Sequence, residues 1–118
     1  MAFTLNTRKA GDVVILDMSG RLSIGEAVLL LRTTVRRFIE DGSLKFVLNL
    51  GNVSHIDSAG LGELISIYTS TRNRQGDVKL LNLDKKAKDL LQMTKLLTVF
   101  DTYHDEAKAI ESLNSGSR

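Results

Sequence analysis

The amino-terminal part of the chain carries the period-two pattern of β-strands. Phe3–Thr7 alternates apolar and polar residues, as a half-buried strand does. A short loop containing Gly11 follows, and Val13–Met18 is a second, mostly apolar run. Two such runs at this separation predict a β-hairpin, and Gly20–Leu22 is predicted to turn the chain out of the second strand.

After this turn the pattern changes to a helical period. Apolar residues recur on one stripe from Ile24 to Ile39, with arginines on the opposite side. Gly42 is a natural carboxyl-terminal stop for this helix. Ser23 is the predicted N-cap, and Glu26, three residues later, would complete a capping box.

The rest of the chain alternates strands and helices. Phe46–Leu50 is a nearly continuous apolar run, which is typical of a strand covered on both faces. The later predicted elements are a helix with the stripe Leu61–Thr71, a strand at Val78–Leu83, a helix capped by Asp84, a short strand within Leu96–Phe100 and a helix at Glu106–Leu113. The order ββαβαβαβα predicts an α/β fold with an N-terminal β-hairpin and a mixed, mostly parallel sheet packed by about four helices. We expect one domain at residues 1–113 and a flexible tail at residues 114–118.

Composition narrows the classes of function. The absence of Cys excludes disulfides, thiolate metal sites and Cys nucleophiles. The net charge of +2 is too small to indicate nucleic acid, and without Trp the chain offers no evident platform for stacking bases. No apolar run is long enough to span a bilayer, and the acidic residues lack metal-ligand spacing. We therefore expect a cytoplasmic protein that has no metal or cofactor and binds neither nucleic acid nor membranes.

The most informative segment lies between the predicted buried strand and the next helix. Asn52–Asp57 is predicted to be a loop, and Ser58 to open a helix that begins near Ala59. A helix start offers unpaired N–H donors and the positive end of the dipole, so it tolerates an added phosphate. The simplest alternative is that Ser58 is only an N-cap, worth ~1 kcal/mol. Gly60 and Gly62 would each cost about 1 kcal/mol relative to Ala, which indicates close approach by neighbouring backbone or by a partner.

The hexapeptide Asp57–Gly62, following the strand Phe46–Leu50, resembles the signature of the STAS-domain anti-sigma factor antagonists, the SpoIIAA-like proteins. The predicted element order matches that family from Phe3 to about Leu113. The resemblance implies a bacterial signal-transduction protein, not itself an enzyme, in a partner-switching circuit that regulates transcription. In such a circuit an anti-sigma factor serine kinase phosphorylates Ser58, and a PP2C-type phosphatase resets it. The unphosphorylated form would bind the kinase and so free a sigma factor. The implied site has no catalytic residue, and its partner-binding residues are Ser23, Asp57, Ser58, Ala59, Gly60, Leu61 and Gly62.

One position departs from the family, and two other functions stay open. Members often carry Asp just after the Gly-x-Leu turn, where this sequence has Ser23. The alternatives are a nucleotide-binding signalling domain that uses the Gly60–Gly62 segment as a phosphate cradle, although Walker and dinucleotide spacings are absent, and a constitutive scaffold. A serine hydrolase is disfavoured, because His55 is predicted in a strand-end loop where neighbouring side chains diverge, and no Gly-x-Ser-x-Gly elbow is present.

Two surface features of the first predicted helix complete the prediction. Arg32, Arg36 and Arg37 form a basic strip that we interpret as a solvated face. Leu29 and Leu30 beside this strip either pack against the closing helix or contact a partner.

Overall fold

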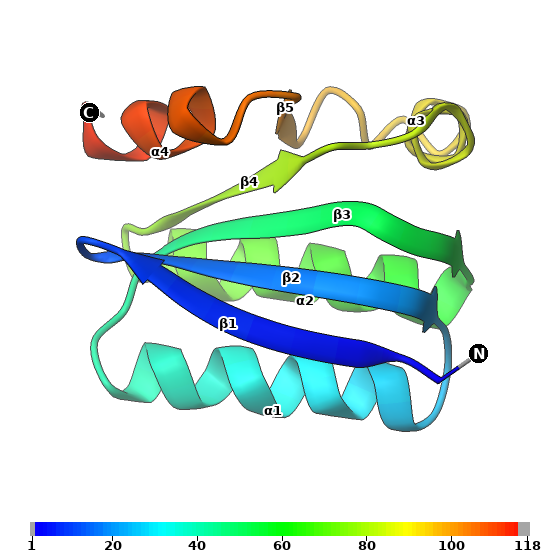
Figure 1. Ribbon diagram of the computed structural model, residues 1–118, viewed down its shortest axis with the longest axis horizontal. Helices are drawn as coiled ribbons and strands as arrows, with labels where there is room; N and C mark the ends of the chain where they lie inside the picture. Colours follow the sequence, from blue (N-terminus) through cyan, green and yellow to red (C-terminus); the bar gives the residue numbers. More distant parts are fainter. Residues whose placement is uncertain (1, 116–118) are drawn as a thin grey trace.

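The computed structural model describes residues 2–115, which form a five-stranded sheet and four helices in the predicted order (Figure 1). The elements are β1 (Thr4–Ala10), β2 (Val13–Leu22), α1 (Glu26–Glu40), β3 (Lys45–Ile56), α2 (Ser58–Asn73), β4 (Asp77–Leu81), α3 (Lys85–Met93), β5 (Asp101–Tyr103) and α4 (Glu106–Asn114). No helix in this described range is long and apolar enough to cross a membrane.

The strands lie side by side in the order of the sequence, β1-β2-β3-β4-β5. β1 and β2 form an antiparallel hairpin, and every later neighbour is parallel. The predicted α/β fold with a mixed, mostly parallel sheet is therefore confirmed. Because parallel strands are joined by right-handed crossovers and each crossover here steps in the same direction, α1, α2 and α3 are required to lie on one face of the sheet.

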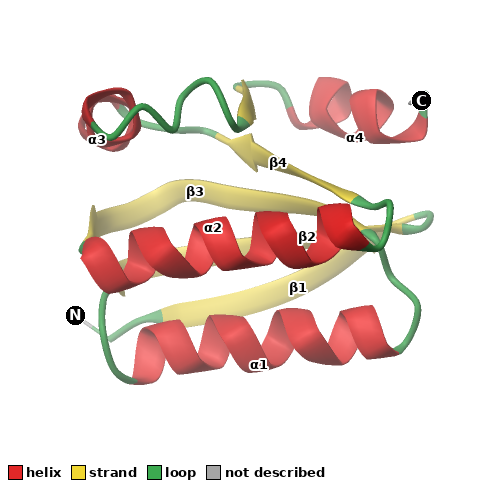
Figure 2. Cartoon of the chain, turned by 180° about the vertical axis from the view of Figure 1, so that it is seen from behind, coloured by secondary structure: helices red, strands yellow, loops and turns green. Residues whose placement is uncertain are grey.

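The packing follows this topology. Buried residues of α1, α2 and α3 share one apolar cluster with the strands, and Figure 2 shows α2 in front of the sheet on this face. Buried residues of α4 belong to a second, smaller cluster. β3 contributes Phe46 and Leu48 to the first cluster and Val47 to the second. The continuous apolar run predicted to be covered on both faces is covered on both faces.

Several predicted boundaries are wrong. β2 continues through Gly20–Leu22, and β3 continues beyond Leu50 to Ile56, where both were predicted to have left the sheet. These polar segments stay extended because they pair with each other in parallel register. The last strand is Asp101–Tyr103 and does not lie within Leu96–Phe100, where Leu96, Leu97 and Phe100 pack into the core instead.

The predicted capping box of the first helix is also wrong. α1 begins at Glu26, and its N-cap is Gly25, with φ 108° and no side-chain hydrogen bond to the helix. Ser23 therefore caps nothing, and Ile24, predicted to face the core, is 78% exposed. A glycine suits this position because its backbone lies in the left-handed region that other residues rarely adopt.

The closing helix differs from prediction in one detail of its face and in its end. Ala107 was predicted to face inward, but it is exposed, and Ala109 is buried instead. α4 includes Asn114, and Ser115 is its C-cap, so the helix runs past the predicted domain end at residue 113. The remaining tail, residues 116–118, lies outside the described residues.

Candidate functional site

The start of α2 is held in place by the carboxylate of Asp57. Its Oδ1 accepts a hydrogen bond from the backbone N–H of Gly60 at 2.8 Å, which makes Asp57 the N-cap of the helix. Its Oδ2 accepts from the backbone N–H of Ile24 at 2.9 Å. The backbone N–H of Asp57 in turn donates to the carbonyl of Leu22 at 3.3 Å. Asp57 thus joins the β3–α2 junction to the turn between β2 and α1.

These contacts also determine the acidity of Asp57. Hydrogen bonds from the backbone N–H groups of Ile24 and then Gly60 lower the pKa of the Asp57 carboxyl, because they stabilise its charged form. The carboxylate is therefore ionised at neutral pH and stays available as a hydrogen-bond acceptor. The positive end of the α2 dipole favours the same charged state.

Ser58 is the first residue of α2, as predicted, but it is not the cap. The alternative that Ser58 serves only as an N-cap is wrong, because Asp57 occupies that position. Ser58 is exposed, and its hydroxyl forms no hydrogen bond with any residue in the described part of the chain. The side chain is left free at a helix start, where the unpaired N–H groups and the dipole accommodate an anion.

The two glycines of the motif have different environments. A Cβ on Gly60 would lie 2.3 Å from the backbone oxygen of Leu22, so α2 can approach β2 only without a side chain there. A Cβ on Gly62 would meet no atom within 4 Å, and Gly62 is exposed. Close packing within the chain therefore accounts for Gly60 without a phosphate ligand, whereas nothing within the described residues requires Gly62.

The other predicted partner-binding residues lie around this helix start. Ala59 and Leu61 are half-buried and pack against the main apolar cluster. Ser23 is half-buried and lines a shallow depression together with Ile24 and Leu30. The Asp57–Ile24 hydrogen bond brings this β2–α1 turn next to Ser58, although the two segments are far apart in sequence.

One charged pair near the site was missed by the sequence analysis. Glu63, one turn beyond the motif, is only 4% exposed, and its Oε1 accepts from Arg32 Nε at 3.0 Å. The pair links α2 to α1. The sequence could have indicated that Glu63 is buried, because Glu63 stands next to Leu64 and four residues before Ile67, and both of these residues lie on the buried face of the helix. Arg32 consequently does not belong to a purely solvated strip.

The remaining sequence candidates give no catalytic centre. His55 lies in β3, not in a loop, and no hydrogen bond joins it to Ser58 in the described range. No group of three or more potential metal ligands occurs within residues 2–115. Leu29 and Leu30 are 58% and 43% exposed, so neither is buried against the closing helix.

Comparison with known proteins gives a consistent result. The sequence profile of the STAS domain matches residues 4–109. A candidate anti-sigma factor antagonist of Thermotoga maritima is 30% identical over 102 residues, covering 86% of this chain and 90% of that protein. The crystal structure of a candidate anti-sigma factor antagonist from the same species has a TM-score of 0.87 at 28% identity, covering 93% of this chain and 94% of that chain. SpoIIAA in its unphosphorylated form has a TM-score of 0.73 at 23% identity, covering 98% of this chain and 100% of that chain, and its phosphorylated form has the same score and identity.

Proposed function

The chain belongs to the STAS domain family, and we propose that it is an anti-sigma factor antagonist switched by phosphorylation of Ser58. Unphosphorylated, it binds an anti-sigma factor serine kinase and so frees a sigma factor for transcription. The kinase phosphorylates Ser58 and ends the interaction, and a PP2C-type phosphatase restores the active form. In this proposal the protein acts in the cytoplasm as a binding module without enzymatic activity or cofactor.

The observation that carries the proposal is the division of roles between Asp57 and Ser58. Asp57 caps α2, whereas Ser58 is exposed with a free hydroxyl. Phosphorylation would add roughly −1.5 to −2 charges at a helix start that tolerates anions, without removing any hydrogen bond that holds the fold. The fold would persist while the surface changes.

The proposed partner-binding surface comprises the start of α2 and the turn that Asp57 attaches to it. Its residues are Ser23, Asp57, Ser58, Ala59, Gly60, Leu61 and Gly62, of which Gly60 and Asp57 act mainly by shaping the surface. A phosphate buried against a partner without a compensating cation would cost several kcal/mol. Each ~1.4 kcal/mol changes affinity tenfold, so this cost alone is enough to release the partner, and the protein does not have to refold.

The test compares Ser58→Ala and Ser58→Asp for binding to each anti-sigma factor serine kinase of the source genome, purified and titrated calorimetrically. We expect Ser58→Ala to bind as wild type and Ser58→Asp to bind more than about tenfold more weakly. Thr69→Asp, which adds the same charge to an exposed position further along α2, should bind as wild type.

Kinase and ATP should also phosphorylate the wild-type protein at Ser58, which mass spectrometry of the digested protein identifies. The phosphorylation proposal fails if both Ser58 variants bind equally well, or if the kinase modifies another residue. A constitutive scaffold would give the first of these results.

A further inference from the structure

β3 extends beyond the end of its neighbour β4, which leaves part of that edge of β3 unpaired. Its pairing with β4 ends at Asn49, whereas its pairing with β2 continues to Ile56. Within the described residues the segment Asn52–Ile56 therefore has a strand partner on one side only. Asn52 and Ser54 on this segment are exposed to solvent. An open strand edge of this kind is a template for pairing with another extended chain.

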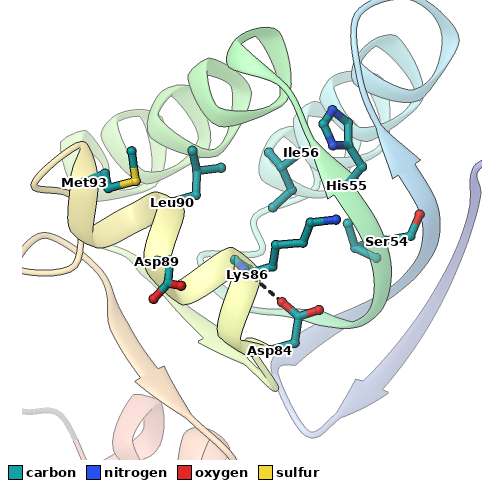
Figure 3. A pocket seen from close by; sticks show the side chains of 10 residues that line it. Ser54, His55, Ile56, Asp84, Lys86, Asp89, Leu90 and Met93 are labelled. Atoms are coloured by element: carbon teal, nitrogen blue, oxygen red, sulfur yellow. Dashed lines mark hydrogen bonds between the residues drawn. The ribbon is translucent and has the colours of Figure 1, made fainter.

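α3 lies next to this open edge, with its axis across the direction of β3 (Figure 1), and forms the other wall of a groove, which we call the β3–α3 groove (Figure 3). The cavity has a volume of about 320 Å³. Its apolar lining comes from both walls and consists of Val53, Ile56, Ala87, Leu90 and Met93. Met93 is 80% exposed, although its side chain is large and apolar. The groove thus combines an open strand edge with an apolar pocket large enough for more than one side chain.

Of the three charged residues at the rim of the groove, two already have bonded partners. Asp84 caps α3 by accepting from the backbone N–H of Ala87 at 2.8 Å, and Asp89 is paired with Lys85 at 3.0 Å. Lys86 is exposed and has no ion-pair partner in the described range. Its side chain reaches from α3 toward β3 across the groove in Figure 3. Lys86 is therefore the one charged lining residue whose charged group has no bonded partner within residues 2–115, and it lies beside two carboxylates that already have theirs.

We propose that the β3–α3 groove binds an extended peptide segment of another protein, which adds as a strand to the open edge of β3. Apolar side chains of the peptide occupy the pocket, and a neighbouring carboxylate pairs with Lys86. In strand addition, main-chain hydrogen bonds supply affinity and side-chain pockets supply specificity. The open edge, the apolar pocket and the unpaired ammonium complement these three features of the peptide. None of the seven residues of the partner-binding surface proposed above lines this groove, and the inference does not depend on that function.

The test begins with selection of a displayed library of random heptapeptides against the full-length protein. We expect the selected sequences to share an apolar residue next to Asp or Glu. Synthetic selected peptides should shift the amide NMR resonances of Asn52–Ile56 and of α3. Each peptide is made in two versions N-methylated at alternate residues, and the version whose methyl groups face β3 should bind about tenfold more weakly than the other, because only those N–H groups pair with the strand. Peptide affinity should be the same for Ser58→Asp as for wild type.

Charge exchange provides the matched controls. Lys86→Glu should weaken the acidic peptides and bind better to versions in which the acid is replaced by Lys. Lys88→Glu, on an exposed residue of α3 outside the groove, should leave binding unchanged. The proposal is overturned if the library yields no peptide that shifts the groove resonances or if Lys86→Glu has no effect. Equal binding of the two N-methylated versions would also overturn it, because the peptide would then bind without main-chain pairing to β3.

Discussion

The ion pair between Arg32 and Glu63 provides a quantitative test of how α1 and α2 are held together beneath the candidate site. Glu63 is 4% exposed, whereas the Arg32 side chain is 44% exposed, so the guanidinium stays partly hydrated while the carboxylate does not. Arg32→Met keeps much of the aliphatic stem and removes the charge. It leaves a desolvated carboxylate without its partner.

The expected cost is set by that carboxylate. Breaking a fully buried pair costs about 3–5 kcal/mol, and the partial exposure of Arg32 reduces this to about 2 kcal/mol for Arg32→Met. Glu63→Gln should cost only about 1 kcal/mol, because an amide oxygen can still accept from Arg32 Nε. The double variant should be less destabilised than the sum of the single variants by about 1–2 kcal/mol, since no buried charge then remains.

Urea unfolding followed by circular dichroism measures all three variants. In a thermal unfolding experiment, a loss of about 2 kcal/mol should lower the Tm by about 8 °C in a domain of this size. Arg37→Met is the control, because Arg37 is exposed on α1 and has no ion pair within residues 2–115; it should change stability by less than about 0.5 kcal/mol. Additive single and double variants would refute the reasoning, as would an Arg32→Met variant as stable as the control.

Two further predictions concern the motif itself. Gly60→Ala should destabilise the fold by about 2–3 kcal/mol, because its Cβ would meet the Leu22 backbone, whereas Gly62→Ala should stabilise α2 by about 0.5–1 kcal/mol; urea unfolding distinguishes the two, and equal effects would contradict the assigned environments. The lowered pKa of Asp57 means that its stabilising contribution is present above the ordinary carboxyl pKa of about 3.9 and is lost as pH falls through the lower pKa of the folded state. The stability difference between wild type and Asp57→Asn should therefore shrink between about pH 5 and pH 2, and a constant difference would argue against the role of the charge.

The order and type of the elements could be predicted from the sequence because they follow from hydrophobic period alone. Strand ends could not, since Asn52–Ile56 and Gly20–Leu22 are extended only through their pairing with each other. Local pattern also misplaced Ile24, because an apolar residue at helical spacing is taken as part of the helix even when the chain has not yet entered it.

The candidate site was located by sequence, but its internal organisation was not. Ser58 was expected at a helix start, and it is there. The contact that organises the site, between Asp57 and the Ile24 backbone, joins segments 33 residues apart. No periodicity or spacing encodes a backbone donor at that distance, so the assignment of the cap to Asp57 required the structure.

The absence of a capping role for Ser23 bears on the position where the resemblance led us to expect Asp. If the side chain at that position had to cap α1, the choice of residue would be limited to good N-caps such as Ser and Asp. Instead α1 starts after Gly25 without a side-chain cap, and the backbone of the turn is attached to α2 through the Ile24–Asp57 hydrogen bond. The residue at position 23 is therefore not constrained by helix capping. By this argument Ser23→Asp would add a negative charge beside the Ser58 helix start without changing how the helix start is built, so we expect this variant to leave stability in urea unchanged within about 0.5 kcal/mol.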